Sequence, residues 1–196
     1  MSVSKSAMVS IERKTKETDI KLQLRVDGSQ SLNIDTGIGF LDHMLTALSS
    51  HARWDLDLTV KGDLEVDDHH TVEDVAIVLG QALQQAWRER GTIQRYGQRL
   101  LPMDEALILC AVDLSGRPYY IGELEFTREV IGGISTEMFE HFFYTLAMQA
   151  QITLHLKPMT FRNNHHLIEG CFKALAYALK EALVTTDGSN STKGML

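Results

Sequence analysis

Hydrophobic and polar residues alternate along several segments of this 196-residue chain. Ile20, Leu22, Leu24 and Val26 occupy every second position, as on a strand with one buried face. Further strands are predicted at 31–35, 54–60, 106–113, 118–125 and 152–157. Apolar residues spaced three and four apart predict helices near 40–48, 72–86, 136–150 and 165–184. The order is therefore β-β-α-β-α twice, which predicts a layered α+β fold.

The two halves also share residues. Aligning 68–83 with 164–179 gives six identities in sixteen positions, and "GFLDHML" at 39–45 resembles "EMFEHFF" at 137–143. A weaker match lays 16–28 on 104–116. We therefore expect residues 1–92 and 93–186 to be two repeat halves of one compact domain, followed by a flexible C-terminal tail at 187–196.

Composition narrows the range of functions. A formal net charge of −7 without a basic tract argues against nucleic-acid binding. No apolar run approaches the roughly 18–20 residues that span a bilayer, and the N-terminus lacks the apolar core of a secretory signal. The two cysteines lie in apolar segments, which is typical of reduced thiols. We expect a cytoplasmic protein that binds neither nucleic acid nor membrane.

Each half carries a His-His-x-x-Glu motif at the front of a predicted helix, in "DDHHTVED" (67–74) and "NNHHLIEG" (163–170). Helical residues four positions apart share a face, so His69 pairs with Glu73 and His165 with Glu169. The other histidine of each motif points about 100° away. One helix start can therefore give two ligands to one metal and one ligand to another.

The ligand set is completed by one earlier histidine in each half, His43 and His141. Six histidines and two glutamates are enough to give two metal ions four protein ligands each. A lone histidine at a helix start is usually a cap or a surface residue, but repetition of the whole set favours a metal site. Imidazole with carboxylate suits several divalent transition metals, so the pattern leaves the metal open. His51 and His155 have no partner in the other half and are assigned structural or surface roles.

Two other function classes fit a pair of metals: a hydrolase that attacks a phosphoester with metal-bound hydroxide, and a metal store or metal-clipped shell without catalysis. Hydrolases of that kind usually bridge their metals with carboxylates, whereas histidine dominates here. Cationic residues between the halves and in the tail favour a small anionic ligand over either alternative.

The motifs "GFLDHML", "DDHHTVEDVAIVLG", "RYG", "MDEAL", "DLSGRPY", "EHFF", "NNHHLIEGCFKAL" and "STKGML" resemble imidazoleglycerol-phosphate dehydratase. The resemblance covers the chain from Glu17 to its C-terminus. It implies a hydro-lyase that converts imidazoleglycerol phosphate to imidazole acetol phosphate in histidine biosynthesis. It also implies a helical bundle packed between two mixed β-sheets, two Mn(II) ions per active site, and a 24-subunit homo-oligomer with active sites where subunits meet.

The resemblance also assigns residues. The manganese ligands it implies are His43, His69, His70, Glu73, His141, His165, His166 and Glu169. Glu17 matches the residue that moves the substrate proton, and Glu169 is taken as catalytic as well as a ligand. The substrate contacts it implies, mostly to phosphate, are Glu17, Arg95, Arg117, Lys173, Ser191 and Lys193, the last two on a tail that closes as a lid. Thr46 and Ala47 depart from the Asp-Gln of many relatives, which places one secondary substrate contact in doubt.

Overall fold

The first half of the chain forms a four-stranded sheet and two helices. The computed structural model describes residues 6–187. The elements of this half are β1 (Val9–Lys14), β2 (Thr18–Arg25), β3 (Leu32–Asp35), α1 (Gly39–Ala52), β4 (Asp55–Gly62) and α2 (His69–Arg88). The strand order is β1-β2-β4-β3, with β3 parallel to β4 and the other pairs antiparallel.

The second half repeats this arrangement. Its elements are β5 (Tyr96–Met103), β6 (Ala106–Asp113), β7 (Tyr119–Gly122), α3 (Glu137–Ala150), β10 (Thr153–Thr160) and α4 (Asn164–Ala182). The strand order β5-β6-β10-β7 again has its one parallel pair at the edge, between β7 and β10. A small hairpin, β8 (Val130–Ile131) and β9 (Ile134–Ser135), precedes α3.

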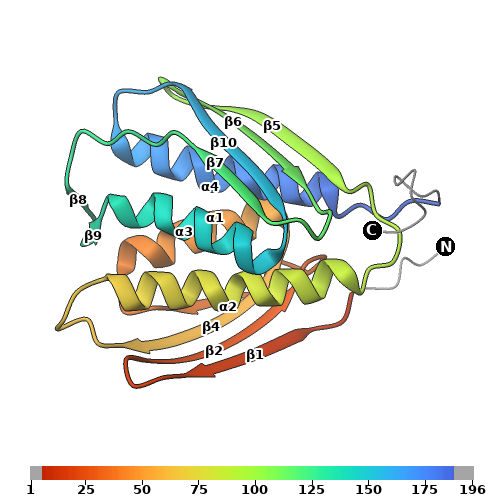
Figure 1. Ribbon diagram of the computed structural model, residues 1–196, viewed down its shortest axis with the longest axis horizontal. Coiled ribbons are helices and arrows are strands. Elements are labelled where there is room, and N and C mark those ends of the chain that lie inside the picture. The colour runs from red at the N-terminus through yellow and green to blue at the C-terminus, as the bar shows by residue number, and fades with distance from the viewer. Residues whose placement is uncertain (1–5, 188–196) are drawn as a thin grey trace.

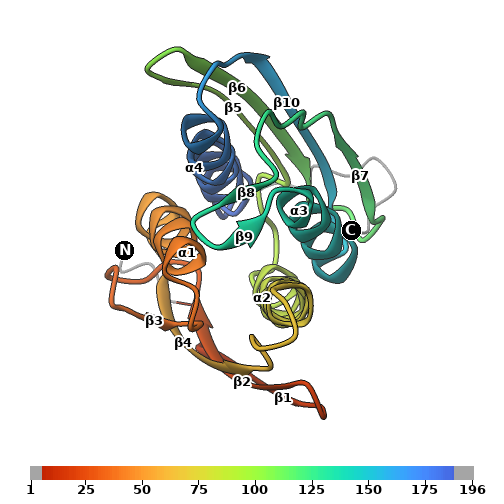
Figure 2. The ribbon, with the colours of Figure 1, turned by 90° about the vertical axis from the view of Figure 1, so that its left-hand side faces the viewer.

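The four helices lie between the two sheets (Figures 1 and 2). Helix α1 packs on α4 and helix α2 packs on α3, so each helix pair joins one helix from each half. The largest fully buried side chains include Trp54, Phe139, Phe142, Phe143 and Phe172. Because one apolar core serves both sheets, the halves form a single layered unit rather than two separate cores.

Helices α1 and α3 end in the same way. Each C-cap residue is left-handed, Arg53 with φ 59° and Gln151 with φ 53°. The following amide then bonds back into the helix, from Trp54 to the Ser49 carbonyl and from Ile152 to the Ala147 carbonyl. This reversal is a common helix end, and it leads each chain directly into the next strand. The repeat therefore extends to the turns that precede β4 and β10.

The predicted α+β fold with a helical bundle between two mixed sheets is confirmed. Each four-stranded sheet has one strand more than the sequence pattern indicated, β1 in the first half and β5 in the second, and the β8–β9 hairpin was not predicted either. Strand β5 lies in the segment between the halves, where most side chains of "YGQRLLPM" are exposed and no alternation marks a buried face. Within residues 6–187, no helix combines the length and the apolar character needed to cross a membrane.

Gly97 allows β5 to approach α4 closely. A Cβ built there would collide with the backbone carbonyl of Ala178, which cannot move without displacing the helix. We expect Gly97→Ala to lower the free energy of unfolding by about 3 kcal/mol, as severe overpacking does. Gly39→Ala is the control, because a Cβ there meets nothing within 4 Å. Urea unfolding of both variants tests this, and equal stability would show that β5 does not rest on α4 as described.

Candidate metal centre

One group of metal-ligating side chains forms where α1 packs on α4. His43 comes from α1, and His165 and Glu169 come from the first turns of α4. The Glu169 Oε2 atom lies 3.0 Å from His165 Nε2 and 3.6 Å from His43 Nε2. One ligand atom from each residue lies within 4.8 Å of the others. We call this group the α1–α4 cluster.

A second group forms where α2 packs on α3. His69 and Glu73 lie on α2, and His141 lies on α3. Glu73 Oε1 lies 2.9 Å from His141 Nε2, and Glu73 Oε2 lies 3.9 Å from His69 Nε2. Their ligand atoms also fall within 4.8 Å of one another. This α2–α3 cluster has the same composition as the first, two imidazoles and one carboxylate.

Both clusters combine residues from the two halves. The His-x-x-x-Glu pair comes from the second helix of one half, and the third residue comes from the first helix of the other half. This exchange follows directly from the helix packing, because α1 lies on α4 and α2 on α3. Six of the eight predicted ligands are therefore placed in two sets of three.

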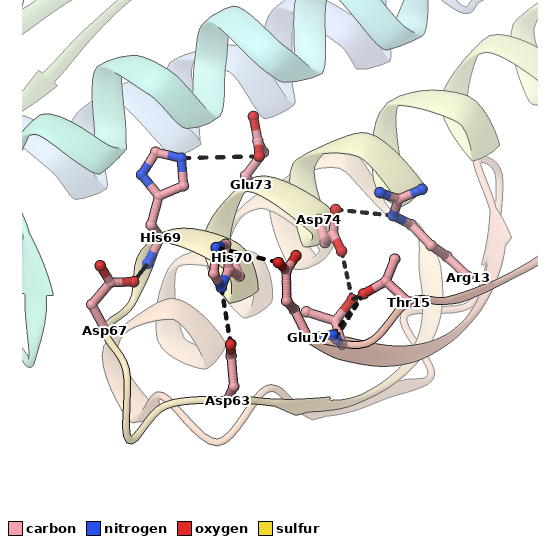
Figure 3. A network of polar contacts seen from close by, with 10 residues as sticks. Arg13, Thr15, Glu17, Asp63, Asp67, His69, His70, Glu73 and Asp74 are labelled. Carbon is pink, nitrogen blue, oxygen red and sulfur yellow. Dashed lines mark hydrogen bonds and ion pairs between the residues drawn. The ribbon is translucent and has the colours of Figure 1, made fainter.

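The remaining two predicted ligands, His70 and His166, lie outside these clusters. His70 Nδ1 is 3.0 Å from Asp63 Oδ2, and its Nε2 is 3.8 Å from Glu17 Oε1 (Figure 3). His166 Nδ1 is 2.8 Å from Glu105 Oε2, and its Nε2 faces Asp104 at 3.6 Å. The helical geometry predicted this divergence from the neighbouring histidines. No set within residues 6–187 of one chain unites four of the eight predicted ligands.

The carboxylates beside these histidines alter their acid–base properties. The hydrogen bond to Asp63 raises the pKa of His70, and the hydrogen bond to Glu105 raises the pKa of His166. In return, the bond from His166 lowers the pKa of Glu105 to about 2. Burial raises the pKa of Glu169, but its hydrogen bond and ion pair with Lys173 outweigh this and leave that pKa below its usual value. Glu105 and Glu169 are thus held ionised, and for Glu169 this is the form in which a carboxylate ligates a metal.

Glu17 occupies the turn between β1 and β2, beside the N-terminus of α2. The Thr15 hydroxyl accepts hydrogen bonds from the amides of Glu17 and Thr18, which closes the turn. Thr18 and Arg13 both contact the buried carboxylate of Asp74 on α2, which fixes the hairpin to the helix. Figure 3 shows the contact between Arg13 and Asp74. The exposed Glu17 side chain is therefore presented beside His70 from a fixed turn.

The predicted phosphate contacts divide between the two ends of the helices. Lys173 lies near the metal ligands, with Nζ 2.7 Å from Glu169 Oε1. Arg95, in contrast, bonds through its amide to the Ala182 carbonyl at the far end of α4. From His165 to Ala182 the helix rises about 25 Å. Within one chain the predicted metal ligands and Arg95 therefore cannot meet on one small substrate.

Arg95 and Arg117 share one carboxylate. Arg95 donates from Nε and Nη2 to Asp113 at 2.6 and 3.0 Å, and Arg117 Nη2 lies 3.6 Å from the same side chain. Arg95 has φ 71° and is buried, whereas Arg117 is exposed. Asp113 thus holds two guanidinium groups together at this end. Ser191 and Lys193 lie outside the described residues.

Sequence reasoning missed Asp63 and Glu105 as residues of the site. Asp63 directly follows β4, seven positions before His70, and Glu105 lies in the β5–β6 turn, 61 positions before His166. Neither spacing marks a contact with a histidine. The signal for Glu105 was its place in the weaker repeat alignment, opposite Glu17.

An open cavity of about 730 Å³ lies against the α2–α3 cluster. Its wall includes His69 and His141 of that cluster. Tyr120, Tyr144 and Glu140 add aromatic and acidic groups. Burial raises the pKa of Glu140. The cluster is thus reachable from outside the chain, as binding of a small molecule requires.

Comparison with known proteins gives consistent matches. The family model for imidazoleglycerol-phosphate dehydratase matches residues 36–179. An imidazoleglycerol-phosphate dehydratase of Acetivibrio thermocellus is 53% identical over 189 residues, which cover 95% of this chain and 97% of that relative. The crystal structure of the dehydratase from Staphylococcus aureus gives a TM-score of 0.83 at 35% identity, covering 92% of this chain and 100% of that one. The structure from Pyrococcus furiosus, in complex with (S)-C348, gives 0.82 at 35% identity, covering 95% and 100%.

Proposed function

The chain belongs to the imidazoleglycerol-phosphate dehydratase family, and from this we propose that it dehydrates its substrate with two Mn(II) ions in each active site. It is a hydro-lyase of histidine biosynthesis that acts on a phosphorylated imidazole. Beyond family membership, we propose that the substrate is the D-erythro isomer of imidazoleglycerol phosphate and that the protein is cytoplasmic. The metal, the roles of the site residues and the assembly are also part of this proposal. The observation that carries the metal proposal is the pair of matching clusters, each with two imidazoles and one carboxylate.

The donor atoms of the clusters fit a divalent transition metal. Imidazole nitrogen with carboxylate oxygen suits Mn(II), Fe(II), Co(II) and Zn(II), whereas structural zinc prefers thiolates. Both cysteines are fully buried, so the clusters contain no thiolate. Burial raises the pKa of Cys110 and Cys171, which keeps both as neutral thiols. Mixed nitrogen and oxygen donors with open positions favour a catalytic metal that can also bind substrate.

The reaction removes a carbon-bound proton and expels hydroxide, and neither step is easy at neutral pH. Bound divalent cations supply Lewis acidity, which stabilises the negative charge that develops as the proton leaves. Glu17 is the general base, because its carboxylate is exposed and fixed beside His70. Lys173 holds Glu169 in its ionised form, so that this carboxylate keeps both of its imidazole contacts.

We place the complete active site between subunits of a 24-subunit particle. Each three-ligand cluster of one chain gains its fourth ligand from His70 or His166 of another chain. The distribution of residues supports this, since these two histidines point away from their own clusters. A neighbouring chain also brings Arg95 and Arg117 to the phosphate, which Lys173, Ser191 and Lys193 bind as well. Guanidinium groups suit phosphate because they donate in pairs.

Glu17→Gln tests the role of the base. Glutamine keeps the size and hydrogen bonding of the side chain but cannot accept the proton, so we expect kcat to fall by about 10²-fold or more. Manganese content should stay at the wild-type level, because Glu17 lies outside both clusters. Glu12→Gln, a change of an exposed carboxylate on β1, is the matched control and should keep full activity. Loss of manganese from Glu17→Gln would make Glu17 a ligand and contradict the assignment.

One assay separates this function from phosphoester hydrolysis and from metal storage. The protein is incubated with imidazoleglycerol phosphate and Mn(II), and both the ketone product and free phosphate are measured. Dehydration gives the ketone without free phosphate, whereas a hydrolase releases phosphate. If the protein binds the metal but forms neither the ketone nor free phosphate, metal storage is the one of the three functions that remains.

A further inference from the structure

We propose that Asp63 and Glu105 are positioning residues that hold His70 and His166 with Nδ1–H bonded inward and Nε2 presented outward as the ligand atom. This inference rests on the proposed function in so far as it concerns metal ligation. Glu105, Asp104 and His166 each place one ligand atom within 4.8 Å of the others. In this proposal the Glu105 carboxylate accepts the Nδ1–H of His166 and is not a metal ligand, as Asp63 accepts that of His70. Both carboxylates act through the two histidines that stand outside the α1–α4 and α2–α3 clusters.

The contacts define which nitrogen is protonated. An ionised carboxylate only accepts hydrogen bonds, so an imidazole nitrogen that bonds to it must carry the proton. Asp63 contacts His70 Nδ1 at 3.0 and 3.3 Å, and Glu105 contacts His166 Nδ1 at 2.8 Å. A neutral imidazole has one N–H, so Nε2 is left with its lone pair in both rings. Each ring therefore presents the unprotonated Nε2 atom, which can ligate a metal ion.

The carboxylate contacts of these two histidines differ from those of the four histidines in the clusters. Each clustered histidine has its Nε2 between 2.9 and 3.9 Å from a glutamate of its own chain, whereas the shortest carboxylate contacts of His70 and His166 are made by Nδ1, at 3.0 and 2.8 Å. His70 and His166 lie beside opposite sheets, at the β1–β2 turn and the β5–β6 turn, with Nε2 directed away from the supporting carboxylate. Without Asp63 and Glu105 each ring would rotate and exchange its proton between the two nitrogens.

The same contact is made by residues that are not equivalent in the repeat. Glu105 directly precedes β6, just as Glu17 directly precedes β2. Glu17 nevertheless lies on the Nε2 side of His70, and the Nδ1 contact is made by Asp63 at the end of β4. The corresponding end of β10 has no acid, since it reads Met-Thr-Phe at 159–161. Two unrelated positions thus supply one contact, which indicates a requirement rather than a relic of duplication.

This difference between the halves has a consequence for Glu17. In the second half, Glu105 is committed to His166 and to the backbone amides of Arg162 and Asn163. In the first half, Asp63 takes the orienting role, and its own amide donates to the Glu17 carbonyl at 3.1 Å. Glu17 therefore does not bind His70 Nδ1, and its carboxylate lies on the side of the ring where Nε2 is presented (Figure 3).

Asp63 is the better residue to change, because the side chain of Glu105 also anchors the loop before α4. We compare full-length Asp63→Ala and Asp63→Asn with Glu65→Ala, a change of an exposed carboxylate in the same loop. The dissociation constant for Mn(II) is measured by competition with a chelator. Loss of an outer partner of a metal ligand typically weakens binding about 10–100-fold.

We expect a weakening in that range for Asp63→Ala, partial recovery for Asp63→Asn, whose amide oxygen still accepts the bond, and no change for Glu65→Ala. A second measurement needs no metal. In metal-free protein labelled with ¹⁵N-histidine, at an alkaline pH where imidazole is neutral, the wild-type His70 spectrum should show Nδ1–H, and Asp63→Ala should shift it towards Nε2–H. Thermal unfolding of the metal-free chains shows whether the variants fold alike.

The outcomes are distinct. If wild type binds Mn(II) and Asp63→Ala binds it equally well, the positioning role is wrong and the proposed function stands. If wild type binds no Mn(II), the proposed function fails, and the tautomer measurement still decides the positioning role. An unchanged His70 tautomer in Asp63→Ala overturns it. Weakened binding that merely follows a loss of folded protein in thermal unfolding also counts against it.

Discussion

Stripping the protein with a chelator should abolish dehydration, and returning Mn(II) should restore it. Among residues 6–187 each cluster offers three ligands within one chain, so an ion bound there needs a further ligand or substrate to complete its coordination. The Lewis acidity that stabilises the developing charge is lost with the ion, and Glu17 alone faces a carbon acid of high pKa. We therefore expect no measurable turnover in metal-free protein.

The same treatment should change the size of the particle. An ion bound by ligands from two chains stabilises the joined state by mass action, because it binds that state and not the separate chains. Light scattering during chelation should show smaller oligomers, with dissociation in step with the loss of activity. Mg²⁺ is the control, because it prefers oxygen ligands and should restore neither property. Full activity in metal-free protein would contradict the mechanism, and an unchanged particle would contradict intersubunit ligation.

The fold was largely predictable because its signals are local and occur twice. The alternation at Ile20–Val26 and the helical spacing near 72–86 correspond to β2 and α2. Strand β5 was not predicted, because its conformation depends on its partner strand β6 and on α4 and not on a buried face of its own. The need for glycine at position 97 could not be predicted either, because the backbone that leaves no room for a side chain there belongs to Ala178, 81 positions away.

The site was predictable to the extent that it depends on helical geometry. The pairs His69–Glu73 and His165–Glu169 follow from a separation of four residues, and both recur in the structure. The assignment of the third residue of each cluster to the opposite half follows from helix packing, which the sequence pattern does not encode. Contacts such as Asp63–His70 and Glu105–His166 join the ends of strands to helices, and no spacing rule identifies them.

His70→Ala and His166→Ala should each be inactive, and mixing the two variants should restore part of the activity. Each substitution removes one outward-facing imidazole and leaves both three-residue clusters intact. The two rings lie beside opposite sheets, and in the proposed intersubunit site the two histidines of any one site come from different chains. In a random 1:1 assembly of a symmetric oligomer, about one site in four then receives both intact histidines.

The variants are combined in the metal-free state, reloaded with Mn(II) and assayed against each variant taken through the same cycle alone. The double variant His70→Ala/His166→Ala mixed with either single variant is the matched control, and it should give no rescue because one of the two histidines is then absent from every chain. Recovery near one quarter of wild-type activity, with a particle of wild-type size, supports shared sites, since intact ligand sets arise only in mixed particles. No recovery in particles shown to contain both variants would contradict the proposal that the two histidines of a site come from different chains, because every site that takes both from one chain keeps one defective histidine.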